Sequence, residues 1–188
     1  MSWLFAYGSL LPAGAATLAP EARPCSLTGW MRSWGVAMDN SVDLPGYKHF
    51  VAPDGERPAL MVAFLDIARQ AGAAVNGAAL PVSEAELPGL DQRERNYTRV
   101  DVTAHLDGDL PGRVWAYVGL DAARERLARG RREGRLAIAS DYYERVLAGF
   151  DLLGQRDVFA RSTAPMPAPV IELEVVLAAP RAEPSSAV

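Results

Sequence analysis

Two short segments of the chain carry side chains that could perform chemistry. The first is LDQRE at residues 90–94, in which Asp91 and Glu94 stand three residues apart and would share one face of a helix. A carboxylate can act as a general acid or base, which typically contributes about 10²–10⁴ in rate. The same pattern is also typical of an ordinary charged helix end with pairs such as Asp91 to Arg95.

The second segment is Tyr7-Gly8-Ser9-Leu10, which ends the apolar run Trp3–Tyr7. The aromatic and aliphatic side chains of that run suit a buried strand. Gly8 permits a positive φ and lets another group approach the backbone closely. The segment is either a plain turn, which a Gly-Ser pair by itself favours, or a turn whose N–H groups at positions 8–10 face a ligand.

The sequence lacks the residues that several other kinds of catalytic or binding site require. Ser9 has no glycine two residues before or after it, so it is not the nucleophile of a serine-hydrolase elbow. His49 and His105 have no acid or cysteine at metal-ligand spacing, and no glycine-rich phosphate loop occurs. We therefore expect no metal and no cofactor. Cys25 is the single cysteine, which fits a reducing compartment.

The composition is that of a globular protein, with 188 residues, 49% hydrophobic residues and a net charge of −4. We expect one domain over residues 1–178 and a disordered tail over 179–188. The acidic balance argues against nucleic acid and anionic membranes as partners. No apolar run reaches the length of a membrane span and no signal peptide is visible, so we expect a cytoplasmic protein. The oligomeric state cannot be inferred.

Strands and helices alternate in an order that predicts an α+β fold, with a mixed sheet curled around a core. Alternating or continuous apolar patterns predict the strands. Residues 70–74 are predicted to be a linker, and residues 170–177 are either an edge strand or a tail packed on the body. Capping residues mark the helices, and the arginines of the second helix are interpreted as a solvated face. The predicted strands are 3–7, 27–38, 59–67, 75–82, 97–106 and 113–118, and the predicted helices are 83–95, 121–132 and one from Ser140.

Five motifs in this order resemble those of the γ-glutamylcyclotransferase superfamily, which includes the AIG2-like proteins. They are Tyr7-Gly8-Ser9-Leu10, Gly77, Leu90-Asp91-Gln92-Arg93-Glu94 followed by Tyr97 and Arg99, Ala116-Tyr117-Val118, and Tyr142 through Gly149. The chain departs from the pattern at Arg95, where a glycine often follows the acid, at Ile138-Ala139, and in the segment from Gln155 onward. An arginine beside the acid can favour its ionised form or narrow the pocket.

The resemblance implies a small, mixed, partly closed β-barrel with flanking helices, and an activity that needs no cofactor. A catalytic member cyclises a γ-glutamyl amide to 5-oxoproline and releases the amine or amino acid. The resemblance assigns the acid–base role to Glu94 and substrate binding to Tyr7, Gly8, Ser9, Leu10, Tyr117, Tyr142 and Arg99.

Some alternatives stay open at this point. Tyr142 either lines the pocket or packs its helix into the core, and Arg99 either binds a carboxylate or pairs with Asp91. The loop 43–55 is expected to form the wall on the leaving-group side, and the identity of the leaving group is open. A non-catalytic small-molecule-binding domain of the AIG2-like type is the alternative to the enzyme.

Overall fold

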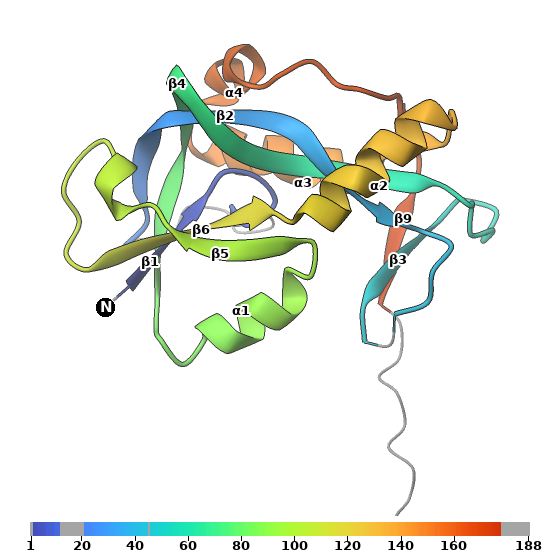
Figure 1. Cartoon of the computed structure of the whole chain (residues 1–188), viewed down its shortest axis with the longest axis horizontal. Helices are drawn as coiled ribbons and strands as arrows, with labels where there is room; N and C mark the ends of the chain where they lie inside the picture. The colour runs from blue at the N-terminus through green and yellow to red at the C-terminus, as the bar shows by residue number, and fades with distance from the viewer. Residues whose placement is uncertain (1, 12–20, 45, 178–188) are drawn as a thin grey trace, which may run out of the picture.

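The protein is described by a computed structural model over residues 2–11, 21–44 and 46–177 (Figure 1). The predicted tail 179–188 lies outside the described residues. The strands are β1 (Ser2–Ala6), β2 (Arg23–Asp39), β3 (Lys48–Val51), β4 (Met61–Val82), β5 (Tyr97–Asp101), β6 (Arg113–Gly119), β7 (Leu136–Ala139), β8 (Val170–Ile171) and β9 (Glu174–Leu177). The helices are α1 (Leu87–Arg93), α2 (Asp121–Arg132), α3 (Ser140–Leu152) and α4 (Arg156–Ser162), with a 3₁₀ turn at Thr103–His105.

One mixed sheet of seven strands forms the body of the molecule. Its order is β5-β6-β1-β4-β7-β8, with β2 also paired to β4. The β1–β4, β2–β4 and β5–β6 pairs are antiparallel, whereas β1–β6, β4–β7 and β7–β8 are parallel. This confirms the predicted α+β class with a mixed sheet and flanking helices, and within the described residues the ladder stays partly open.

Strands β2 and β4 form one long antiparallel hairpin across the molecule (Figure 1). The predicted linker at 70–74 is therefore wrong, because these residues continue β4. Gly29 and Gly72 adopt positive φ angles of 76° and 77°, and the pairing register shifts between Thr28 and Trp30. Glycine and a bulge let the two strands bend together without ending their pairing.

A fully buried arginine joins the first strand to the helices. Arg32 donates from its guanidinium to the Tyr7 carbonyl (3.3 Å) and the Asn76 carbonyl (3.2 Å). Its guanidinium carbon lies 4.6 Å and 4.8 Å from the ring centres of Phe150 and Phe159. Burial lowers the pKa of Arg32 to about 9, so the side chain stays charged at neutral pH. Arg32 thus fixes the backbone at the end of β1 against α3 and α4.

The predicted helix starts need correction. Helix α1 begins at Leu87 rather than Ser83, although Glu86 accepts hydrogen bonds from the backbone N–H and hydroxyl of Ser83 at 2.8 and 2.7 Å. Both hydrogen bonds run from Ser83 to Glu86 and form in the turn before the helix. Asp121 and Ser140 are the first residues of α2 and α3, and neither helix has a side-chain cap.

The strand predicted at 97–106 ends earlier, at Asp101. The Asp101 carboxylate accepts hydrogen bonds from the N–H (3.0 Å) and hydroxyl (2.6 Å) of Thr103. Aspartate side chains that bond the backbone two residues on favour turns. The chain therefore leaves the sheet in the 3₁₀ turn Thr103–His105 before β6 returns beside β5.

Candidate active site

The end of β1 and the end of α1 meet at a small cavity of about 30 Å³. Glu94 follows α1 directly, with φ −89° and ψ 49°. The cavity, called here the inner cavity, is lined by Tyr7, Gly8, Ser9, Leu10, Leu65, Glu94, Tyr97, Tyr117 and Tyr142. The structure therefore brings together every site residue predicted from the sequence except Arg99.

The turn after β1 is closed by a hydrogen bond from the Leu11 N–H to the Gly8 carbonyl (3.0 Å). Gly8 does not adopt a positive φ, so that part of the sequence argument is wrong. A Cβ added to Gly8 would lie 3.3 Å from a Leu65 methyl carbon and 3.7 Å from the Tyr142 hydroxyl. A larger residue here would require Leu65 to shift by a few tenths of an ångström, because β4 and α3 lie close to the backbone.

Two further glycines of the motif set hold the turn in place. A Cβ on Gly77 of β4 would lie 2.3 Å from the Ala6 carbonyl oxygen, which is too close for any side chain. A Cβ on Gly149 of α3 would lie 2.6 Å from the Leu11 Cβ. The glycines at these positions allow β4 and α3 to pack directly on the residues before and after the Tyr7–Leu10 turn.

Three tyrosine hydroxyls of the inner cavity are fixed by the backbone. Tyr7 donates to the Tyr117 carbonyl (2.6 Å) and Tyr97 donates to the Leu65 carbonyl (2.7 Å). The Tyr142 hydroxyl accepts from the Leu65 N–H (3.1 Å) and is also hydrogen-bonded to Ser9. Tyr142 therefore lines the pocket and packs in the core as well. Sequence reasoning placed Tyr97 in a motif but did not count it among the site residues.

Burial raises the pKa values of Tyr7, Tyr97 and Tyr142, and the nearby Glu94 charge raises them further. The phenolate form is therefore disfavoured, and all three rings stay protonated at neutral pH. The Glu94 side chain is 19% exposed, and its Oε1 lies 3.2 Å from the Arg93 Nε. The inner cavity thus holds one carboxylate among neutral hydroxyl groups.

Asp91 organises the outer side of the site. It accepts a hydrogen bond from the Tyr117 hydroxyl (2.8 Å) and two from Arg99, both at 3.1 Å. The Arg99 guanidinium also stacks 4.8 Å from the Trp115 ring centre. Of the two roles open for Arg99, the structure shows the pair with Asp91 and places the side chain outside the inner cavity. Asp91 in turn orients Tyr117.

A larger space of about 820 Å³ adjoins the inner cavity and shares Ser9, Leu10 and Glu94 with it. This outer chamber is lined by Ser9, Leu10, Leu11, Gly46, Tyr47, Lys48, Gly89, Gln92, Arg93, Glu94, Arg95, Arg145, Val175 and Leu177. Its wall includes residues 46–48, within the loop expected on the leaving-group side. The inner cavity has room for about one water molecule, so a larger ligand at Glu94 must extend into the outer chamber.

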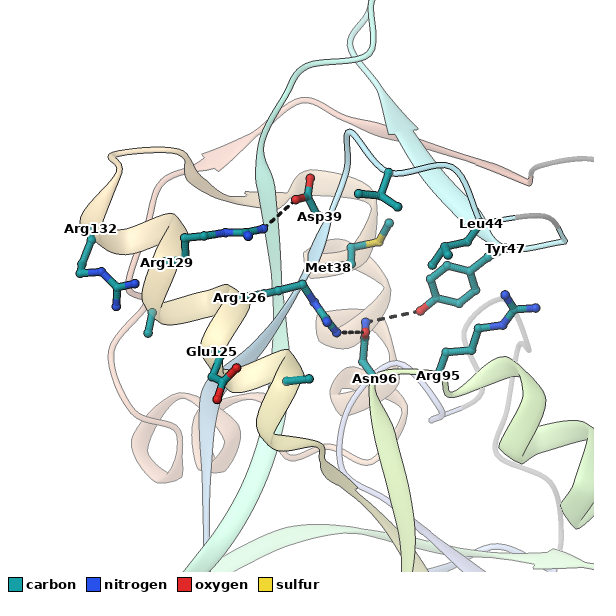
Figure 2. A pocket seen from close by; sticks show the side chains of 13 residues that line it. Met38, Asp39, Leu44, Tyr47, Arg95, Asn96, Glu125, Arg126, Arg129 and Arg132 are labelled. Atoms are coloured by element: carbon teal, nitrogen blue, oxygen red, sulfur yellow. Dashed lines mark hydrogen bonds and ion pairs between the residues drawn. The ribbon is translucent and has the colours of Figure 1, made fainter.

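A second large hollow of about 780 Å³ runs along α2 and is called here the α2 groove (Figure 2). It shares Tyr47 and Arg95 with the outer chamber. Figure 2 shows Arg126 reaching across the groove, where it donates to the Asn96 side-chain oxygen (2.8 Å). Asn96 also contacts the Tyr47 hydroxyl (3.4 Å).

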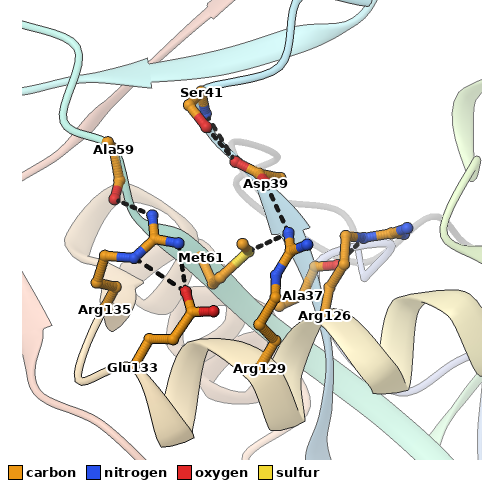
Figure 3. A network of polar contacts seen from close by, with 9 residues as sticks. All are labelled: Ala37, Asp39, Ser41, Ala59, Met61, Arg126, Arg129, Glu133 and Arg135. Atoms are coloured by element: carbon orange, nitrogen blue, oxygen red, sulfur yellow. Dashed lines mark hydrogen bonds and ion pairs between the residues drawn. The ribbon is translucent and has the colours of Figure 1, made fainter.

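Three arginines of α2 contact the sheet, which corrects their interpretation as a solvated face, whereas Arg131 and Arg132 are exposed as that interpretation expects. Arg126 donates to the Ala37 carbonyl (2.9 Å) and Arg129 pairs with Asp39 (2.7 Å), as Figure 3 shows. Arg124 on the same helix pairs with the buried Asp66 (3.0 Å). These contacts anchor α2 on β2 and β4.

In the part of the chain that the structure describes, no three His, Cys, Asp or Glu side chains are grouped to hold a metal ion. Among the helices of those same residues, none is both long and apolar enough to cross a membrane.

The chain resembles a known protein family in sequence and solved structures in fold. Residues 4–145 match the model of the family described as "Gamma-glutamyl cyclotransferase, AIG2-like". No curated protein matches the chain in sequence. A solved structure named "Gamma-glutamyl cyclotransferase" is similar with a TM-score of 0.50 and 13% identity, covering 90% of this chain and 93% of that chain. An uncharacterized protein from Homo sapiens is similar with the same TM-score, identity and coverage. These two likenesses concern the fold, whereas the family match spans both the Tyr7–Leu10 turn and Glu94. The chain belongs to the AIG2-like γ-glutamyl cyclotransferase family.

Proposed function

We propose that the protein is a γ-glutamyl cyclotransferase that converts a γ-glutamyl amide to 5-oxoproline and a free amine or amino acid. The observation that carries the proposal is the meeting of Glu94 with the Tyr7–Leu10 turn at one cavity. A carboxylate and preorganised backbone donors on opposite sides of a reacting group are the parts that this reaction needs.

The reaction requires no enzyme nucleophile, because the substrate attacks itself. Its α-amino nitrogen forms a bond to the γ-carbonyl carbon, which closes a five-membered ring and breaks the amide bond to the leaving nitrogen. Holding the two groups in a near-attack shape removes much of the entropic barrier. The α-ammonium group first loses one proton to solvent. Glu94 then takes a second proton from the same nitrogen as the ring closes and delivers it to the leaving nitrogen, so the lactam keeps one N–H and the amine departs neutral.

The remaining site residues would orient the substrate. The N–H groups of Ser9 and Leu10, in the middle of the turn, would donate to the γ-carbonyl oxygen as negative charge develops on it. The hydroxyls of Tyr117 and Tyr142 would hold the glutamyl group. Because burial raises the pKa values of both tyrosines, they act as neutral hydrogen-bonding groups rather than as bases.

The test is release of 5-oxoproline from a panel of γ-glutamyl dipeptides, glutathione and γ-glutamylamines. We expect turnover by the wild type and a loss of about 10²-fold or more in Glu94→Gln, because the variant cannot transfer the proton. Glu144→Gln removes an exposed carboxylate from α3 and serves as the matched control. It should retain wild-type turnover.

Circular dichroism would establish that each variant is folded. Turnover that survives in Glu94→Gln would contradict the acid–base assignment. A folded wild type that binds γ-glutamyl compounds but releases no 5-oxoproline would favour the non-catalytic binding domain.

A further inference from the structure

The outer chamber is strongly cationic. Its lining contains the side chains of Lys48, Arg93, Arg95 and Arg145, against the single carboxylate of Glu94. Because the chamber adjoins Glu94 on the side away from the inner cavity, it is the space that a leaving group would occupy. The charge of this lining therefore bears on which leaving groups fit.

Lys48 is the most informative of the four cations, since it is the only lysine in the sequence. Its ammonium nitrogen lies 4.6 Å from the Phe64 ring centre and 6.0 Å from that of Tyr47. No carboxylate of the described residues forms an ion pair with it. Burial lowers the pKa of this ammonium group, as expected for a desolvated cation without a close counter-charge.

The backbone of Lys48 lies in a strand of the chamber wall. Strand β3 begins at Lys48 and pairs antiparallel with β9, where Leu177 is the partner of Lys48. Val175 and Leu177 of β9 line the same chamber. The ammonium group is thus presented from a paired strand rather than from a free loop.

The arginines around Lys48 make exposed contacts that a ligand can replace. Arg145 pairs with Asp141 at 3.2 Å, and both side chains are more than a third exposed. Arg93 contacts Glu94 at 3.2 Å and is 60% exposed. Exposed ion pairs contribute little to stability, so these guanidinium groups can turn towards an anionic ligand at little cost.

We propose that the outer chamber selects γ-glutamyl compounds whose leaving group is an acidic amino acid, with Lys48 binding the side-chain carboxylate of that group and the chamber arginines attracting both of its carboxylates. The inference rests on the proposed cyclotransferase activity. The substrate class is an anionic γ-glutamyl dipeptide, and a γ-glutamyl derivative of a cationic amine is disfavoured. The products are 5-oxoproline and the free acidic amino acid.

The test compares γ-glutamylglutamate with γ-glutamylglutamine, which have nearly the same shape and differ by one charge. We expect the wild type to favour γ-glutamylglutamate in kcat/KM by about 10- to 100-fold, the range for a hydrogen bond between charged groups. Lys48→Met should reduce this ratio towards one, with a larger loss of kcat/KM for γ-glutamylglutamate than for γ-glutamylglutamine. Arg156→Met removes an arginine of α4 that is paired with Asp151 of α3, and this variant should keep the wild-type ratio.

Acetylation of the wild type gives a second measurement that does not require a variant to fold. The amines available to the reagent are Lys48, the single lysine of the sequence, and the terminal amine, and acetylation should lower the ratio as Lys48→Met does. Reductive methylation retains the charge of these amines and should not lower the ratio. The Lys48→Arg protein should keep its ratio after acetylation, which separates Lys48 from the terminal amine.

Binding separates a failure of this inference from a failure of the proposed function. Calorimetry on the Glu94→Gln variant requires no turnover, and γ-glutamylglutamate should bind about 10-fold more tightly than γ-glutamylglutamine. Turnover of both substrates with equal kcat/KM would overturn the inference and leave the cyclotransferase standing. Tighter binding of γ-glutamylglutamate without any turnover would support the inference and overturn the activity. An equal loss of kcat/KM for both substrates in Lys48→Met would also overturn the inference, because Lys48 would then act in the chemistry or the fold.

Discussion

The α2 groove and the outer chamber are two hollows of similar size, about 780 and 820 Å³, and arginines line both. In the groove, Arg126 and Arg129 donate to acceptors that the protein itself provides. In the chamber, Lys48 contacts aromatic rings and has no carboxylate partner among the described residues. The number of cations therefore does not distinguish an anion site from a structural cluster. What distinguishes them is that the chamber contains one cation, Lys48, that forms no ion pair with a carboxylate of the described residues.

The largest expected effect is a loss of stability when an arginine of the α2 groove is replaced. Arg126→Met should lower the free energy of unfolding by about 1–3 kcal/mol, because the carbonyl of Ala37 and the buried side-chain oxygen of Asn96 would lose their donor. Urea unfolding measures this loss. Arg131→Met, at an exposed position of the same helix, should change stability by less than about 0.5 kcal/mol.

The same Arg126→Met protein should keep the preference for γ-glutamylglutamate, since the groove arginines are structural. If the variant were as stable as the wild type but lost the substrate preference, the contrast between the two hollows would disappear.

The next effect is a pH dependence confined to the chamber. Burial lowers the pKa of Lys48; Glu94 and Asp141 oppose the shift, and Arg145 and Arg93 add to it. The cation is present below its pKa and is lost as the pH rises through it, at a pH below the ordinary lysine value of about 10.4. The preference for γ-glutamylglutamate should therefore fall, by up to about 10-fold, on the alkaline side.

Measuring the ratio of the two kcat/KM values removes the titration of the substrate's own α-amine, which both substrates share. Lys48→Arg should move the alkaline fall to higher pH, because a guanidinium has a higher intrinsic pKa than an ammonium group. The same fall in Lys48→Arg would assign the titration to another group.

The smallest effect is a dependence on ionic strength. The exposed guanidinium groups of Arg93 and Arg145 attract a carboxylate partly through solvent, where salt screens the interaction. Raising the salt from low concentration to about 1 M should reduce the substrate preference by roughly two- to threefold. The stability of the groove contacts, tested by unfolding in the same salts, should respond less to such screening than the chamber does. A preference that does not change with salt would restrict selectivity to Lys48.

Much of the site was predictable, because its residues fall in short motifs. The Tyr7–Leu10 turn, Glu94, Tyr117 and Tyr142 converge as the family resemblance implied. The sequence offered the pair of Arg99 with Asp91 as one of two roles but could not decide between them, since the pairing requires α1 to lie beside β5. Lys48 had no motif, and its neighbour across the ladder, Leu177, is far away in sequence.

The fold was predictable where a local hydrophobic pattern determines the structure. It was less predictable where pairing with a distant strand overrides the local pattern. The hairpin of β5 and β6 follows from alternation and a turn. The residues at 70–74 have the composition of a linker, yet β4 runs through them without a break. Only Ala74 of this segment has a partner on β2, and the ladder resumes at Arg69. Strand propensity depends on the partner strand, and a single sequence does not show which partner a polar segment will find.

The pairing of β3 with β9 has a consequence for motion. Each strand has four residues, and they form a two-stranded sheet separate from the main one. Closing so long a loop for so few hydrogen bonds gives a small net gain, so this pair should be among the first units to open in native-state hydrogen exchange. Such an opening would loosen one wall of the chamber while Glu94 and the Tyr7–Leu10 turn stay in the protected body. Product could then leave through a local fluctuation that does not disturb the catalytic groups.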